Sequence, residues 1–167
     1  MHELAITVIG PDRTGIVADV AEALAAVGAN LTDSTMTRLR GHFTMTLVCT
    51  GPSSAEAVEA LESLSGVVTS VSSVEPEDDR QAGGEPYVVS VHGADRLGIV
   101  AAVTRVVAAA GGNITDLSTR LAGTLYVLLA EVDLPAGSAG ELAEQLAVAA
   151  AELGVEVTLR RAESEIL

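Results

Sequence analysis

The sequence predicts an α+β protein made of two copies of one small unit, and three observations support this. Residues 4–34 align with residues 87–117 without a gap, and about half of the aligned positions are identical. In several short segments the apolar residues alternate, which is typical of strands, and in others they recur at spacings of three and four, which is typical of helices. The segment 75–86 between the copies is rich in proline, glycine and acidic residues. We therefore expect domains at 1–74 and 87–167 joined by an acidic linker at 75–86.

The first half of the unit is predicted to contain a strand, a helix and a second strand. In residues 4–9, Leu4, Ile6 and Val8 alternate with Ala5, Thr7 and Ile9, as expected for the first strand. Residues 15–27 carry apolar residues on one face of a helix, and Gly28 is placed to end that helix. Residues 30–39 are rich in threonine and other residues that favour strands.

The second half of the unit is predicted to contain a hairpin, a second helix and a last strand. Residues 40–42 suit a hairpin turn, and the residues after it alternate along a returning strand. Ser53 and Ser54 can cap the following helix, and residues 67–74 form the last strand. The order βαββαβ is the ferredoxin-like arrangement, so we expect two four-stranded antiparallel sheets with helices on one face. In the second copy the second helix, 139–153, is longer.

The alignment of the two copies needs one further decision beyond residue 34. We place a one-residue gap there, which aligns Phe43, Met45 and Leu47 with Leu125, Val127 and Leu129.

Composition limits the possible functions. The net charge is −14, from 9 basic and 23 acidic residues, and aromatic residues make up 2% of the chain. An acidic surface with few aromatic side chains disfavours binding to nucleic acid. No apolar run is long enough to span a membrane, and the first residues do not resemble a signal peptide. Cys49 is the only cysteine. We expect a cytoplasmic protein without an internal disulfide or a cysteine metal cluster.

The candidate binding feature is a glycine-flanked loop between the first strand and the first helix of each copy. The segments 10–15 and 93–98 share the pattern Gly-x-Asp-Arg-x-Gly. Backbone N–H groups at a helix start favour a carboxylate, and the aspartate on the same loop can hold an ammonium group. Together these groups suit a zwitterion such as a free amino acid. The alternative is structural: the glycines permit the turn, Asp12 caps the helix and Arg13 points into solvent.

Other polar residues give weaker signals. Asn30 and Asn113 follow the helix-ending glycines, where an asparagine suits a turn and equally suits hydrogen bonding across an interface. His92 is expected to be a packed histidine, Cys49 a small core residue, and the glutamates of residues 56–62 a solvated helix face. No catalytic, dinucleotide-binding or zinc motif is present. We therefore expect no enzyme activity, no cofactor and no metal.

The two loops, each followed by Gly-x-Asn-x-Thr-Asp, resemble the ACT domain, and the resemblance covers all of the chain except the linker and tail. ACT domains are βαββαβ modules that bind amino acids or other small effectors and regulate an enzyme or a transcription pathway. A tandem pair without a catalytic domain resembles the glycine cleavage system transcriptional repressor group, whose members are regulators lacking a DNA-binding fold. The resemblance thus implies an amino acid effector, a protein partner and a homodimer. A ligand-independent interaction module is the alternative.

The resemblance also implies a ligand position, between the first loop of one domain and the second strand of its neighbour. The family often has proline where this chain has Thr14 and Leu97, so the two sites need not be equivalent. Serine-binding members carry histidine where this chain has glycine, so serine specificity is not implied. The implied ligand-binding residues are Asp12, Arg13, Thr14, Gly15, Ile16, Asn30 and Leu31 with Asp95, Arg96, Leu97, Gly98, Ile99, Asn113 and Ile114.

Overall fold

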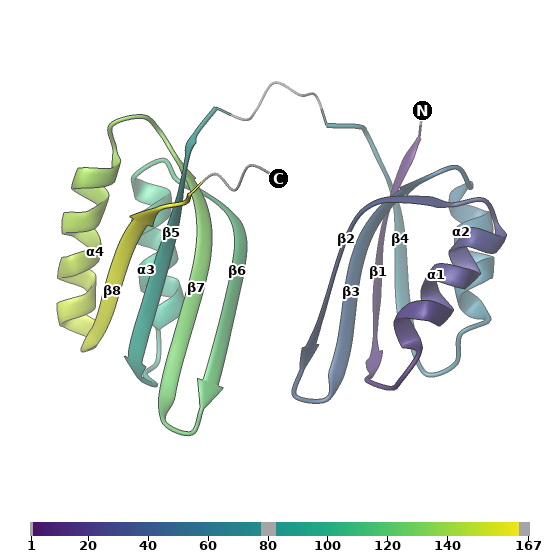
Figure 1. The fold of residues 1–167 in the computed structure, drawn as a ribbon, viewed down its shortest axis with the longest axis horizontal. Coiled ribbons are helices and arrows are strands. Elements are labelled where there is room, and N and C mark those ends of the chain that lie inside the picture. Colours follow the sequence, from purple (N-terminus) through teal and green to yellow (C-terminus); the bar gives the residue numbers. More distant parts are fainter. Residues whose placement is uncertain (1, 78–82, 164–167) are drawn as a thin grey trace. The chain divides into compact units, whose positions relative to one another are not determined.

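The computed structural model describes residues 2–77 and 83–163. The chain divides into two compact units, Met1–Asp78 and Asp79–Leu167. Each unit has the order βαββαβ, and in each the helices cover one face of a four-stranded antiparallel sheet (Figure 1). The predicted fold is confirmed in both copies.

The elements lie close to their predicted positions. Strand β5 begins inside the segment expected to be a linker, and residues 78–82 of that segment lie outside the described residues. The first unit contains β1 (Glu3–Pro11), α1 (Ile16–Ala26), β2 (Asn30–Leu39), β3 (His42–Thr50), α2 (Ser54–Glu62) and β4 (Val68–Val74). The second contains β5 (Glu85–Ala94), α3 (Ile99–Ala109), β6 (Asn113–Ala122), β7 (Leu125–Leu134), α4 (Ala139–Leu153) and β8 (Val155–Arg161).

The strand order places the first strand of each unit in the interior of its sheet. The orders are β2-β3-β1-β4 and β6-β7-β5-β8, so β2 and β6 are edge strands. Because strand side chains alternate between faces, every second residue of β1 and β3 points toward the helices and is buried. The first core is formed by Leu4, Ile6, Val8, Ile16, Val20, Leu24, Phe43, Met45, Leu47, Cys49, Ala57 and Leu61.

The predicted one-residue gap between the copies is wrong. Gly10 pairs with Phe43 in the first sheet, and Gly93 pairs with Tyr126 in the second, so Phe43 corresponds to Tyr126 and the spacing is constant. Leu125 and Leu129 lie on the outer face of their sheet and are each 47% exposed. Since the side-chain period of a strand is two, a shift of one residue moves every side chain to the other face.

Gly51 joins β3 to α2 in a conformation that requires glycine. Its φ is +117°, and a Cβ atom there would collide with the carbonyl oxygen of Gly28 at the end of α1. We expect Gly51→Ala to destabilise the first unit by about 2–4 kcal/mol, because backbone strain and steric overlap add. Gly140→Ala is the control, since this helical position has open space around it and alanine favours helices. Thermal unfolding of both variants gives the comparison, and equal stability of the two would contradict it.

Candidate functional site

In the loop between β5 and α3, the backbone N–H groups at the start of the helix are not capped by a side chain. Gly98 occupies the N-cap position of α3 with φ +90°, and no side chain caps the helix. The first helical hydrogen bond runs from the Ala102 N–H to the Gly98 oxygen, so the N–H groups of Ile99, Val100 and Ala101 precede it. The first turn of α3 contains no acidic residue. An anion can therefore approach these N–H groups without repulsion from the helix itself.

The side chains of the same loop point in different directions. Asp95 is exposed and has no ion-pair partner among the described residues. The guanidinium of Arg96 donates to the carbonyl oxygen of Glu152 at 2.9 Å, which fixes the loop to the end of α4. Leu97 is 99% exposed, while Ile99 is buried in the core. The side chain of Ile99 is thus unavailable to a ligand, and this residue offers only its backbone.

The corresponding loop of the first unit has more of its polar groups occupied. The carboxylate of Asp12 lies 3.5 Å from the guanidinium of Arg38. Arg13 pairs at 2.6 Å with Asp19, an acidic residue in the first turn of α1. Gly15, with φ +85°, is the N-cap and no side chain caps α1. The alternative expectation that Asp12 caps the helix is therefore wrong, whereas Arg13 is exposed, as that alternative expected, and forms its ion pair at the surface.

A pocket of about 360 Å³ opens beside the second loop. Residues 95–101 line it together with Tyr126, which belongs to β7. Sequence reasoning missed Tyr126 because the predicted gap aligned its neighbour Leu125, and not Tyr126, with Phe43 of the first copy. Correct pairing with Gly93 would have placed this tyrosine beside the loop.

The predicted asparagines lie at the opposite end of each sheet from the loops. Asn30 pairs with Thr50, which pairs with Glu3 at the start of β1, whereas the loop follows Pro11 at the end of β1. A strand of this length spans about 27 Å, far more than an amino acid. The loop and the asparagine of one unit therefore cannot contact the same small ligand.

A β-bulge follows each asparagine. The register shifts between Leu31 and Asp33 in the first unit and between Ile114 and Asp116 in the second. The Thr32 hydroxyl donates to the carbonyl oxygen of Val48 at 3.2 Å. In the second unit the matching Thr115 hydroxyl donates to the carbonyl oxygen of Glu131. A bulge increases the local twist of its strand, so both copies share a strongly twisted start of their second strand. The repeated Asn-x-Thr-Asp sequence was the available signal.

A family model described as the ACT domain matches residues 2–65 and 85–160. The chain belongs to the ACT domain family. A UPF0237 protein from Methanopyrus kandleri is 43% identical over 75 residues, which are 44% of this chain and 83% of that protein. A second UPF0237 protein, from Methanocaldococcus jannaschii, is 37% identical over 75 residues with the same coverage of both chains.

Two solved structures match both ACT domains together. The crystal structure of an unknown protein from Galdieria sulphuraria has a TM-score of 0.82 and 31% identity, covering 98% of this chain and 100% of that one. The structure of a candidate glycine cleavage system transcriptional repressor has a TM-score of 0.68 and 22% identity, covering 98% of each chain. The second likeness establishes the shared tandem fold.

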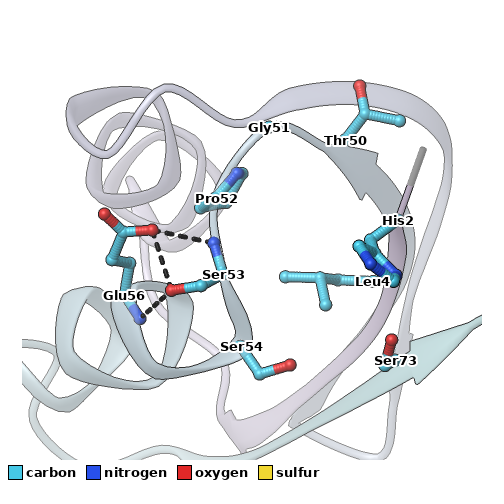
Figure 2. Close-up of a pocket in the computed structure, with 9 residues that line it drawn as sticks. All are labelled: His2, Leu4, Thr50, Gly51, Pro52, Ser53, Ser54, Glu56 and Ser73. Atoms are coloured by element: carbon cyan, nitrogen blue, oxygen red, sulfur yellow. Dashed lines mark hydrogen bonds between the residues drawn. The ribbon is translucent and has the colours of Figure 1, made fainter.

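The first ACT domain also has a wider pocket, of about 710 Å³, near the start of β1 (Figure 2). Leu4 points toward its centre, and Pro52 and Ser53 border it where β3 leads into α2. The Ser53 hydroxyl accepts from the Glu56 N–H, and the Glu56 carboxylate accepts from the Ser53 N–H at 2.8 Å. This capping box confirms the predicted cap at Ser53 and satisfies polar groups on that side of the pocket.

The capping box predicts a pH dependence for the first ACT domain. Hydrogen bonds from the Ser53 backbone and side chain lower the pKa of Glu56. A carboxylate with a lowered folded-state pKa stabilises the fold above its unfolded-state pKa, and that stability disappears as the pH falls through the folded-state value. We expect Glu56→Gln to lower the melting temperature at pH 7 and to match the wild type only in acid below the lowered folded-state pKa of Glu56. A pH-independent difference would contradict this.

Two further residues can now be placed in the ACT domains. His92 is exposed on the outer sheet face, 2.7 Å from Glu156, so the expected packed histidine is wrong: alternation along β5 directs it away from the helices. Cys49 is buried as expected, and burial raises the pKa of its thiol. It is therefore held in the protonated, unreactive form.

The described residues contain no group of three or more histidine, cysteine and acidic side chains able to hold a metal ion. In the same residues, every helix is too short or too polar to cross a membrane.

Proposed function

We propose that this ACT-domain protein binds a small amino acid at the loop between β5 and α3. The observation that carries the proposal is the pocket of about 360 Å³ lined by residues 95–101. ACT domains of regulatory proteins typically bind amino acids, and this loop offers the two groups that a zwitterion needs. The N–H groups at the start of α3 receive the α-carboxylate, and Asp95 receives the ammonium group.

The exposed Leu97 supports this assignment. Leu97 is 99% exposed at the mouth of the pocket, and covering it removes apolar surface from water, which is favourable. We propose that a second ACT domain covers it and contributes an asparagine at the start of its own second strand. This completes the site, because the asparagine of the same unit lies at the far end of the sheet.

The proposed role is regulation through a protein partner, without catalysis and without direct contact to DNA. A net charge of −14 repels the phosphate backbone, so a transcriptional role would need another protein to contact DNA. Ligand binding stabilises the closed pair of domains in a homodimer and thereby changes the surface presented to that partner. A ligand at a hundredfold excess over its Kd stabilises the bound form by about 2.7 kcal/mol.

A thermal-unfolding panel of the twenty amino acids tests the proposal. We expect one or a few of them to raise the melting temperature of the full chain, and Asp95→Ala to abolish the increase. Glu156→Ala is a matched control, because it removes an exposed carboxylate that lies outside the loop. If none of the twenty raises the melting temperature at millimolar concentration, the chain acts as a ligand-independent interaction module instead.

A further inference from the structure

The pocket of about 710 Å³ in the first unit lies at the end of the sheet away from the glycine-flanked loop. Its lining includes Leu4 at the start of β1 and Ser73 at the end of β4, and these two residues pair across the sheet. The loop follows Pro11, at the other end of β1. The residues that line the pocket include none from that loop and none from β2. A ligand here is therefore bound independently of an amino acid at a loop site.

The floor of this pocket is apolar. Leu4 points toward its centre and Pro52 borders it (Figure 2), and both residues are buried. An apolar floor under an open pocket favours a ligand with an apolar face, such as the C–H groups on one side of a ring.

Hydroxyl groups border the floor. Ser54, the first residue of α2, and Ser73 both line the pocket, and neither hydroxyl forms a hydrogen bond with another described residue. The Ser53 hydroxyl, in contrast, is occupied by the capping box. His2 lies beside Leu4 and adds an imidazole (Figure 2). Because a hydroxyl both donates and accepts, the two free serines match the hydroxyl groups of a neutral ligand.

The charges around the pocket disfavour ionised ligands. Neither arginine nor lysine is among the lining residues, so an anion finds no cationic partner there. The pKa of Glu56 is lowered by its hydrogen bonds to Ser53, and its negative charge at the start of α2 repels an anion. Figure 2 shows this carboxylate on the far side of Ser53 from Leu4, so it is also poorly placed to receive an ammonium group over the floor.

The second copy does not repeat this arrangement. Tyr87 takes the place of Leu4 and Arg161 takes the place of Ser73, because these residues form the equivalent pair across the second sheet. The guanidinium of Arg161 lies 3.8 Å from the carboxylate of Glu85. A bulky ring and an ion pair thus stand where the first copy has an apolar floor and a free hydroxyl.

We propose that the pocket of the first unit binds a neutral, hydroxylated ring of monosaccharide size. Its C–H face lies on Leu4 and Pro52, and its hydroxyl groups bond to Ser54 and Ser73. The volume of about 710 Å³ is within the range of small-molecule sites. Free sugars, cyclic polyols and nucleosides all carry such a ring, and the experiment separates these sources.

Amide chemical shifts of the full chain test the assignment. The neutral probes are D-glucose, D-ribose, myo-inositol and adenosine, and D-glucuronate and D-glucosamine are the charged counterparts of glucose. We expect at least one neutral probe to shift the signals of Leu4, Gly51 and Ser54 with a Kd below about 20 mM. If glucose binds, glucuronate should bind at least about fivefold more weakly, because Glu56 repels it. Saturation with adenosine alone would identify the nucleoside as the source of the ring.

Variants of the two serines locate the ligand. Ser54→Ala should weaken binding about threefold to tenfold through the loss of one hydrogen bond. Ser73→Arg places the arginine of the second copy in the pocket and should weaken binding at least about tenfold. Ser72→Arg is the matched control, because it adds the same side chain to the same strand on the outer face, where Ser72 pairs with Ala5. We expect it to bind as the wild type does.

Three results would overturn the proposal. They are the absence of saturable shifts with every neutral probe, binding of glucuronate or glucosamine more tightly than every neutral probe, and unchanged affinity in both Ser54→Ala and Ser73→Arg. The signals of residues 95–101 are recorded in the same spectra during titration with amino acids and report on the loop site. Saturation there without any response at Leu4, Gly51 and Ser54 to the neutral probes would refute this inference and leave the proposed function intact. The reverse pattern would do the opposite.

Discussion

Leu128→Ala should destabilise the second unit by about 2–5 kcal/mol, whereas Leu129→Ala should cost less than about 1 kcal/mol. The two leucines are neighbours on β7, but Leu128 is fully buried against the helices and Leu129 is 47% exposed on the outer face. Removing the buried side chain leaves a cavity in the core formed by the sheet and two helices. Hydrogen exchange of the β7 amides in the full chain measures the stability of this unit separately from the other.

The comparison tests the strand register directly. With the predicted one-residue gap, Leu129 would align with Leu47 and share its place in the core. In the observed register it aligns with Thr46, which lies on the outer face. A larger loss of stability in Leu129→Ala than in Leu128→Ala would contradict the observed register.

Asp95→Ala should weaken amino acid binding much more than Asp12→Ala. Asp95 has no ion-pair partner among the described residues, while Asp12 lies 3.5 Å from Arg38 and its side chain is only 29% exposed. The residue in the second copy that corresponds to Arg38 is Leu121, which cannot compete for the aspartate. We expect Asp95→Ala to lose at least tenfold in affinity, about 1.4 kcal/mol, since it removes one charge-assisted hydrogen bond.

The measurement is calorimetric titration of each variant with the amino acid that stabilises the wild type. Arg38→Leu is the matched test in the first copy, because it removes the ion pair of Asp12 and places there the residue found at Leu121. We expect this variant to gain binding at the first loop. Equal losses in Asp12→Ala and Asp95→Ala would show that the ion pair does not distinguish the two loops.

The sequence predicted the fold well because its local signals agree with one another. Helix-ending Gly28, the turn at 40–42 and the cap at Ser53 each fix a boundary from local backbone chemistry. The register of β7 was not predictable from the same signals, because both of its faces carry aliphatic residues near the hairpin. The alternation of Ala130, Val132 and Leu134 with acidic residues marks the buried face only toward the end of the strand.

The candidate site was predicted in part. The repeated Gly-x-Asp-Arg-x-Gly pattern located both loops, and the structure places them at strand–helix junctions with left-handed glycines. The differences between the loops depend on residues distant in the sequence. Arg38 reaches Asp12 from β2, and the carbonyl oxygen of Glu152 reaches Arg96 from the end of α4. Such long-range contacts have no local sequence signal.

The position of Gly10 has no room for a side chain, which explains why the loop has glycine there. A Cβ atom at this position would lie 2.8 Å from the Gly66 oxygen, and the equivalent atom at Gly93 would lie 2.9 Å from a methyl group of Val155. Any side chain is excluded where the loop passes the last strand of the sheet. A histidine therefore has no place at this position in either copy.

Isothermal titration of the full chain with each of the twenty amino acids is the decisive measurement for amino acid binding by the loop at residues 95–98. We expect saturable binding of at least one of them, lost in Asp95→Ala and retained in Glu156→Ala. Absence of saturable heat for all twenty up to about 10 mM, a limit equivalent to about 2.7 kcal/mol of binding free energy, would contradict it.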